Sequence, residues 1–150
     1  MSTTRSVDLL IAAPADAVWA AIADVTRMGE WSPECIAARW IGGATGPAIG
    51  AEFEGDNEAR VAGRVVKRWT TTSVVTACEP GRSFAFVAEK YTTWRYELVA
   101  EGDGTRVTES FEYVASGLMG TLYDTVLMRP RLMTSGMQRT LERIKDALER

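Results

Sequence analysis

The chain has 150 residues, of which 46% are hydrophobic and 25% are charged, a composition typical of a globular protein rather than of a disordered or membrane-spanning one. This length is that of one ordinary domain, so we expect a single domain over residues 1–150. Seventeen basic and twenty acidic side chains leave a net charge of −3, and no nucleic-acid partner is expected. The sequence contains no histidine, which excludes Ser-His-Asp triads, Cys-His dyads and histidine-ligated metals.

The two cysteines give no sign of redox or metal chemistry. Cys35 and Cys78 lie far apart in the chain, without a CxxC pair, and we interpret both as small buried hydrophobic residues. Because no Cys, Asp and Glu cluster has metal-ligand spacing, neither a metal nor another cofactor is expected. The apolar stretch 9–13 is too short for a signal sequence or a membrane span, which favours a cytoplasmic protein without integral membrane association.

The first part of the chain predicts a strand, a helix and a turn. Apolar residues at alternate positions of 6–13 have the period of a β-strand. Residues 14–24 follow with apolar side chains three and four positions apart, the spacing of an amphipathic helix. The segment 27–34 is irregular because Pro33 resists helix continuation, and Trp31 is expected to pack across this turn.

The middle of the chain predicts short strands separated by turns. Strands 35–41 and 51–55 flank a glycine-rich loop that matches no phosphate-binding motif. Residues 63–77 are rich in Val, Thr and Trp, and a Pro-Gly turn separates them from a strand that contains Phe86. We therefore predict a hairpin between these two strands.

Basic residues interleaved with Trp69 form a separate pattern, which consists of Arg60, Arg64, Lys67 and Arg68. Such a pattern is associated with nucleic acid binding. On a strand that alternates into solvent it is more typical of a solvated face, and we interpret it as one.

The clearest signal is a hairpin within residues 91–114 (YTTWRYELVAEGDGTRVTESFEYV). Asp103-Gly104 is a preferred dipeptide for a two-residue turn. This turn predicts three cross-strand pairs: Trp94 with Tyr113, Tyr96 with Phe111, and Leu98 with Glu109. One face of the hairpin is then aromatic and the other carries charge pairs. Glu109 becomes the one charged group on the apolar face.

The last third of the sequence predicts helices. Residues 118–128 form an apolar segment, which Pro130 breaks or kinks. Apolar residues at helical spacing then continue from Met133 to Leu148, in an amphipathic helix of about eighteen residues. Its apolar stripe is expected to pack on the aromatic face of the sheet.

The order of strand, helix, short helix, six strands and long C-terminal helix resembles the START/Bet v 1-like superfamily, also called the SRPBCC or polyketide cyclase/dehydrase family. The segments that carry the resemblance are VDLLIAAPADAVWAAIADV, EWSPE, EPGRSFAF, GDGTRVTESFEY and MQRTLERIKDAL. The resemblance implies an α+β helix-grip fold, in which a seven-stranded antiparallel sheet curves around the long C-terminal helix, with two short helices after the first strand. It also implies a hydrophobic ligand cavity between sheet and helix, but no particular substrate.

The expected cavity wall combines aromatic residues, which suit a planar or polycyclic ligand, with methionines, which adapt to different apolar shapes. The candidate ligand-binding residues are Trp31, Trp69, Phe86, Trp94, Tyr96, Leu98, Glu109, Phe111, Tyr113, Met133 and Met137. The alternative is that these aromatic and methionine side chains fill a core that has no cavity.

Glu109 and Tyr96 are the candidate catalytic residues. A carboxylate on an apolar sheet face is desolvated, which raises its pKa and suits proton abstraction beside a carbonyl or hydrogen-bond donation to a ligand. The Tyr96 hydroxyl would orient a ligand oxygen. The alternative is that Glu109 lies near the end of the sheet, where its side chain is solvated.

Three functions from different classes fit these features. The first is binding of a hydrophobic small molecule, such as a lipid, polyketide or aromatic metabolite, in the cavity. The second is a cyclase-, aromatase- or dehydratase-like enzyme, in which Glu109 with Tyr96 or Tyr113 assists enolisation and dehydration. The third is a protein-interaction module that uses the concave surface. The sequence leaves open whether a reaction is catalysed, and it also leaves open the oligomeric state.

Overall fold

The protein folds as a seven-stranded antiparallel sheet with helices on one face. The computed structural model describes residues 2–114 and 129–150. Its elements are β1 (Ser2–Ile11), α1 (Ala15–Ala23), the 3₁₀ turn η1 (Val25–Arg27), α2 (Met28–Trp31), β2 (Cys35–Ile41), β3 (Glu52–Val61), β4 (Arg64–Glu79), β5 (Ser83–Ala88), β6 (Thr92–Glu101), β7 (Gly104–Val114) and α4 (Arg129–Leu148). The predicted helix-grip fold, with short helices after the first strand and a long C-terminal helix, is confirmed.

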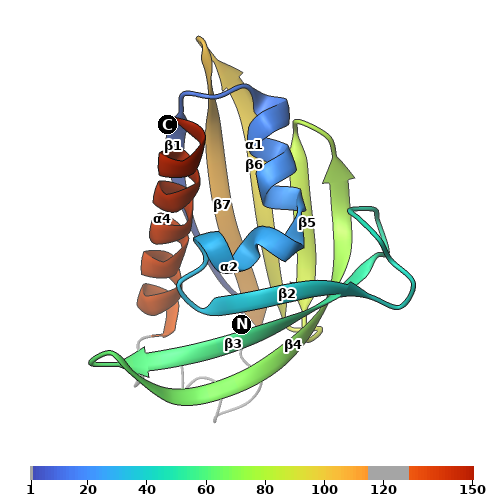
Figure 1. The fold of residues 1–150 in the computed structure, drawn as a ribbon, viewed down its shortest axis with the longest axis vertical. Helices are drawn as coiled ribbons and strands as arrows, with labels where there is room; N and C mark the ends of the chain where they lie inside the picture. The colour runs from blue at the N-terminus through green and yellow to red at the C-terminus, as the bar shows by residue number, and fades with distance from the viewer. Residues whose placement is uncertain (1, 115–128) are drawn as a thin grey trace.

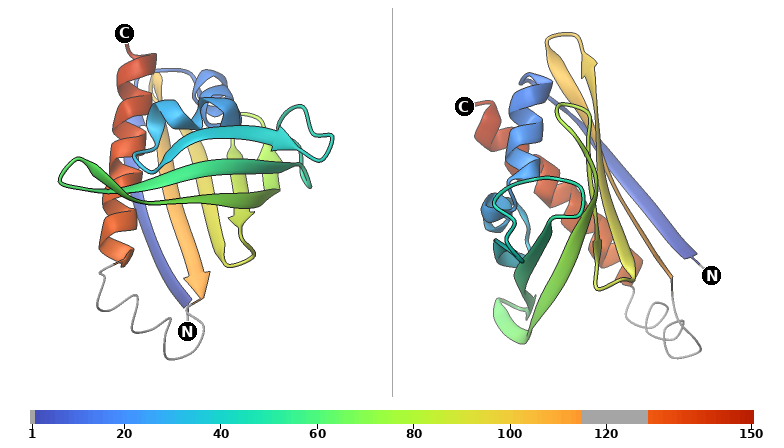
Figure 2. Two further views of the ribbon diagram at one scale, coloured as in Figure 1. Left: turned by 60° about the horizontal axis from the view of Figure 1, so that its bottom comes forward. Right: turned by 90° about the vertical axis from the view of Figure 1, so that its right-hand side faces the viewer.

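The sheet has the strand order β1-β7-β6-β5-β4-β3-β2, and every neighbouring pair is antiparallel. In Figure 1 the sheet curves so that β2, β3 and β4 cross in front of the strands that follow. The helices lie together on the inner side of this curve, as the side view in Figure 2 shows. α4 packs against β1 and β7, and α2 contacts both β2 and α4. The inner face of the sheet is therefore the face that α1, α2 and α4 cover.

The helix α1 buries the apolar stripe that its sequence predicts. Val18 and Ile22 are buried in the core, and the stripe continues at Val25 in η1. The indole nitrogen of Trp19 donates a hydrogen bond of 2.8 Å to the carbonyl oxygen of Ser83, which ties α1 to the start of β5. The buried apolar stripe, which follows the 3.6-residue period, and one long-range hydrogen bond thus hold this helix on the sheet.

The helix α4 is twenty residues long, and Pro130 lies in its first turn. Proline is tolerated there because the first backbone N–H groups of a helix have no partner within the helix. Met137, Leu141 and Ile144 form the buried stripe, as their helical spacing predicts. The predicted apolar segment 118–128 lies outside the described residues.

The predicted register of the β6–β7 hairpin was wrong by two residues. The turn is Gly102-Asp103 instead of Asp103-Gly104, so Tyr96 stands opposite Glu109. Trp94 then pairs with Phe111, and Leu98 pairs with Val107. A shift of two residues keeps every side chain on its predicted face, because side chains alternate along a strand with a period of two.

Two glycines explain this shift. Gly102 has φ +61, so it supplies the left-handed conformation that the turn requires. Gly104 serves instead for close packing, because a Cβ at this position would lie 2.5 Å from the backbone oxygen of Ile11. A close contact with the end of β1, far away in sequence, is thus compatible with glycine at position 104, while Gly102 forms the turn.

Replacing Gly104 by alanine is expected to destabilise the fold by about 1–3 kcal/mol, because the added methyl group meets backbone rather than a flexible side chain. Urea unfolding of Gly104→Ala measures this loss. Gly46→Ala is the matched control, since a Cβ at Gly46 meets nothing within 4 Å. Equal stability of the two variants would show that β1 does not pack closely on Gly104.

Candidate functional site

A buried carboxyl and a buried phenol meet on the inner face of the sheet. Tyr96 in β6 and Glu109 in β7 stand directly opposite each other. The Tyr96 hydroxyl donates a hydrogen bond of 2.9 Å to Glu109 Oε2. Only 3% of Glu109 and 8% of Tyr96 are exposed to solvent. The corrected register thus creates a direct contact between the two candidate catalytic residues.

Burial controls the protonation of this pair. Loss of solvation raises the pKa of Glu109 to about 8, and the hydrogen bond from Tyr96 opposes this shift with a smaller effect. The pKa of Tyr96 is raised well above its usual value, first by burial and then by the nearby Glu109 charge. At neutral pH both groups therefore carry their protons, and Glu109 is a neutral acid that can donate a hydrogen bond.

The second oxygen of this carboxyl has no partner. Glu109 Oε1 is fully buried and forms no hydrogen bond with any residue in the described part of the chain. An unsatisfied buried polar atom costs about 1–3 kcal/mol, so such an atom in a folded protein calls for an explanation. A ligand oxygen that accepts the Glu109 proton would remove this cost.

A second buried polar atom without a partner comes from α2. Trp31 is 4% exposed, and its indole Nε1 finds no acceptor among the described residues. The rest of this residue is held firmly: Arg143 of α4 donates a hydrogen bond of 3.2 Å to its carbonyl oxygen. The Arg27 guanidinium lies 4.6 Å from the ring centroid, a cation–π distance. Trp31 is thus a fixed hydrogen-bond donor in the core.

The other predicted ligand-binding residues fall into two buried clusters. Trp31, Tyr96, Leu98 and Phe86 belong to the larger cluster. Phe111, Tyr113 and Met137 form the smaller one, against which Met133 packs. Trp94 is half-buried and packs against both clusters, so it links them.

The aromatic rings of the smaller cluster form one stacked pair and one tilted pair. Phe111 and Tyr113 are nearly parallel, with ring centroids 5.8 Å apart and an interplanar angle of 17°. Trp94 lies beside them, 5.6 Å from the Phe111 centroid. Trp94, Phe111 and Tyr113 thus share one face of the β6–β7 hairpin, as the alternation of their positions predicts.

Trp69 lies outside both clusters. It stands in β4 opposite Asn57 of β3, and the ammonium of Lys67 lies 5.1 Å from its ring centroid. Trp69 is half-buried. The structure therefore does not bring this predicted residue into contact with the rest of the predicted wall.

Sequence reasoning missed Phe53 and Asn57 on the inner face of β3. Both are buried, and the Phe53 ring meets Phe86 edge to face at 4.9 Å. The Asn57 amide nitrogen donates to Thr71 Oγ1 at 3.2 Å and to two backbone carbonyls of β3 and β4. The predicted strand ended at residue 55, because a polar Asn breaks the apolar alternation. The signal that could have found Phe53 is its period-two spacing within that strand.

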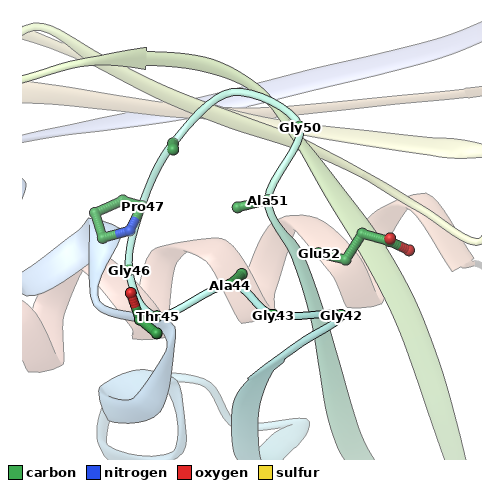
Figure 3. Close-up of a pocket in the computed structure, with 10 residues that line it drawn as sticks. Gly42, Gly43, Ala44, Thr45, Gly46, Pro47, Gly50, Ala51 and Glu52 are labelled. Atoms are coloured by element: carbon green, nitrogen blue, oxygen red, sulfur yellow. The ribbon is translucent and has the colours of Figure 1, made fainter.

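Two hollows described on the surface are separate from the Tyr96–Glu109 pair. The first, about 480 Å³ in volume, lies within the glycine-rich loop (Figure 3), where Thr45 and Glu52 are the only polar side chains in its lining. The second, of about 430 Å³, lies where Leu10 and Lys145 approach the β6–β7 turn. The glycine-rich loop therefore offers few side chains for recognition of a ligand.

Neither cysteine forms a disulfide. Burial raises the pKa of the Cys35 thiol to about 11 and also raises that of Cys78, so both thiols are neutral and poorly nucleophilic.

Within residues 2–114 and 129–150 no group of three or more Cys, Asp and Glu side chains could hold a metal ion. None of the helices in these ranges is long and apolar enough to cross a membrane.

Comparison with known families identifies the class of protein. The family model described as polyketide cyclase/dehydrase and lipid transport matches residues 2–149, and the chain belongs to this family. A comparison with curated proteins found no match.

Solved structures agree with this assignment. The Polyketide_cyc-like protein Cgl2372 from Corynebacterium glutamicum is 32% identical, with a TM-score of 0.68 over 99% of this chain and 93% of that chain. The di-domain ARO/CYC StfQ from the steffimycin biosynthetic pathway is 17% identical, with a TM-score of 0.76 over 99% of this chain and 51% of that chain. The AHSA1-like protein from Aeromonas hydrophila is 21% identical, with a TM-score of 0.67 over 98% of this chain and 92% of that chain. The last two likenesses concern the fold alone.

The buried carboxyl predicts that the fold loses stability as the pH rises. The pKa of Glu109 is about 8 in the folded protein against an ordinary value of 4.5, so between these values the folded state holds a proton that the unfolded state has lost. The free energy of unfolding therefore falls by up to about 1.4 kcal/mol per pH unit across this interval and levels off above it.

Glu109→Gln removes the titrating group but keeps an oxygen that accepts the Tyr96 hydrogen bond. Urea unfolding between about pH 5 and 8 is expected to show a flatter pH dependence for this variant than for the wild type. Glu112→Gln, on the exposed face of the same strand, is the control and should follow the wild-type curve. Parallel curves for Glu109→Gln and wild type would contradict a neutral buried carboxyl.

Proposed function

We propose that the protein binds an apolar, planar small molecule that carries an oxygen able to accept a hydrogen bond, and that protonated Glu109 donates this bond. The observation that carries the proposal is the buried Glu109 Oε1, which has no partner among the described residues. The Tyr96 hydrogen bond occupies the other carboxyl oxygen, so it holds the carboxyl in one orientation. Membership of a family whose fold is used for hydrophobic ligands supports the same conclusion.

The surroundings of the carboxyl support an aromatic or polycyclic ligand. Phe111, Tyr113 and Trp94 present ring faces and edges on the same side of the sheet. Offset stacking on such rings adds about 0.5–1.5 kcal/mol per pair beyond the burial of apolar area. Met133 and Met137 pack on this group from α4, where flexible thioethers tolerate different ligand shapes.

Trp31 supports a second polar contact. Its Nε1 is a buried donor that also has no acceptor within the described chain, and it comes from α2 rather than from the sheet. Both unsatisfied groups are donors at neutral pH. A ligand that reaches both donors would need two acceptor oxygens, as in a dicarbonyl or a quinone.

A matched pair of probes tests the role of Glu109. Fluorenone and fluorene have nearly the same shape, and only fluorenone has a carbonyl oxygen. Equilibrium dialysis at about pH 6 is expected to show roughly tenfold tighter binding of fluorenone, because a buried donor gains a partner. This preference should fade above about pH 8, where Glu109 ionises and can no longer donate.

Two variants separate the hydrogen bond from the shape of the site. Glu109→Gln should keep the preference for fluorenone at every pH, because its amide donates and does not titrate. Glu109→Leu should bind both probes equally. Equal binding of the two probes by the wild type, or binding of neither, would refute the proposed function.

A second candidate function is a cyclase- or dehydratase-like reaction in the same site. The specific observation in its favour is a hydrogen-bonded carboxyl whose pKa of about 8 suits proton transfer at neutral pH. In this reaction the ionised fraction of Glu109 would take a proton from the carbon between two ketones, and that carbon would bond to the carbon of another ketone, whose oxygen receives the proton and becomes a hydroxyl. Glu109 would then take the second proton from the same carbon and return it to the hydroxyl, so that a C=C bond forms as the C–O bond breaks and water leaves.

A poly-β-ketone thioester is the substrate that tests this reaction. Glu109→Gln is expected to lower kcat by about 10²–10⁴-fold while substrate binding remains, since general acid–base catalysis contributes effects of this size. Tyr96→Phe should cause a smaller loss and move the pH optimum, because the phenol only adjusts the acidity of Glu109. Unchanged turnover in Glu109→Gln would refute the enzymatic role.

The third function, protein interaction through an open aromatic groove, gains no support, because Phe86, Phe111 and Tyr113 are buried.

A further inference from the structure

The hairpin of β3 and β4 ends in an apolar tip that is exposed to solvent. We define the hairpin tip as residues 58–68. Val61 and Val66 within it are 64% and 62% exposed. In Figures 1 and 2 this hairpin projects past α4 and beyond the rest of the sheet. The tip therefore places two valines where no part of the described chain covers them.

The turn itself makes the tip apolar. Ala62 and Gly63 are its two central residues, with φ +51 and φ +80. Two-residue turns in which both residues have positive φ strongly favour Asn-Gly or Asp-Gly, because an ordinary side chain is strained there. This turn has alanine at the first position instead of the preferred Asn or Asp, so a methyl group lies beside Val61. The tip thus lacks the polar side chain that such turns usually carry.

Cations surround this apolar tip, namely Arg60, Arg64, Lys67 and Arg68. Glu58 is the only acid in the segment, and it pairs with Arg60 at 3.0 Å and with Arg68 at 3.1 Å. The hairpin tip therefore carries a charge of +3, whereas the whole chain carries −3. Arg64 forms no ion pair with any described residue.

We propose that the hairpin tip docks on the surface of an anionic lipid bilayer. Val61, Ala62 and Val66 would enter the boundary between headgroups and acyl chains, and Arg64 and Lys67 would contact lipid phosphates. Exposed apolar residues flanked by cations are the combination that interfacial membrane binding requires. The sequence pattern suggests that these basic residues only face solvent. In this proposal they bind lipid phosphates instead.

The shape of the tip favours a bilayer over other anionic partners. A stable protein interface buries about 800 Å² on each partner, and a narrow projecting turn offers no groove or broad face for such a contact. Single-stranded nucleic acids need aromatic platforms for their bases, whereas the large exposed hydrophobic residues of the hairpin tip are valines. The neighbouring Trp69 is half-buried, and Lys67 lies against its ring. A fluid lipid surface needs no shape complementarity, so a small convex tip is sufficient.

The expected binding is weak, reversible and sensitive to salt. Each cation near an anionic leaflet strengthens partitioning by about fivefold, and salt screens this attraction within about one Debye length. The proposal is independent of the ligand in the Tyr96–Glu109 site, since the hairpin tip and that pair lie on different strands.

Vesicle co-sedimentation tests the proposal with the full chain. The two vesicle types are pure phosphatidylcholine and phosphatidylcholine with roughly a third of phosphatidylglycerol, at low ionic strength. We expect binding to the anionic vesicles only, and its loss in about 0.5 M salt. Arg64→Glu/Lys67→Glu should weaken partitioning by at least about tenfold, and Val61→Ser/Val66→Ser should weaken it by several-fold.

Control variants make the same changes elsewhere on the surface. Arg82→Glu/Arg139→Glu changes the net charge equally at two other exposed positions, and Val99→Ser removes an exposed valine from β6. These controls should bind like the wild type, and circular dichroism confirms that each variant is folded.

Three results would overturn the proposal. The first is equal sedimentation with both vesicle types, and the second is unchanged binding by both hairpin-tip variants. The third is retention of the wild type on a single-stranded oligonucleotide, lost in Arg64→Glu/Lys67→Glu, without any binding to vesicles.

Discussion

The burial of one carboxyl on the inner face of the sheet is the constraint on which the site depends. Glu109 lies in β7, between Val7 of β1 and Tyr96 of β6, so its backbone is paired on both sides and its side chain cannot swing out to water. An ionised carboxylate in this position would be costly, and the group stays neutral instead. The same burial that costs stability creates an acid with a pKa near neutrality. The proposed binding through that proton and the proposed catalysis by it would both use this one physical property.

The two buried polar side chains that lack a partner among the described residues come from elements that are distant in the chain. Trp31 lies in α2 and is held by Arg143 of α4, so the N-terminal and C-terminal parts of the protein fix its indole together. Tyr96 comes from the sheet and fixes the carboxyl itself. Each polar group is positioned by a second residue that a ligand need not touch. In the proposed function, such support would keep the donors in place before a ligand arrives and would reduce the entropy lost on binding.

The strands β3 and β4 have different chemistry along their length. Within the body of the sheet, β3 places Phe53 and Asn57 on the inner face. At the projecting end, the two strands carry the exposed valines and the cations of the hairpin tip. Alternation along a strand allows this, because successive side chains point to opposite faces and a projecting end has solvent on both. An acidic chain thus carries a local charge of +3 on one protruding turn, away from a neutral apolar interior.

Local patterns in the sequence determined the elements and the faces they bury. The helical spacing of Met137, Leu141 and Ile144 predicted the stripe of α4, and the period of two in β7 predicted that Glu109 shares a face with aromatic residues. Both inferences depend only on the positions of residues along one helix or strand. The two-residue error in register therefore did not affect them.

Tertiary structure decided everything that depends on contacts between distant segments. The end of β1 packs closely against Gly104, Gly102 has the left-handed conformation in the turn, and in this register Tyr96 lies opposite Glu109. The depth of burial at Glu109, and hence its pKa, follows from the helices that cover the sheet. Residue types and periodicity do not contain that information, because solvation of a side chain depends on which parts of the folded chain surround it.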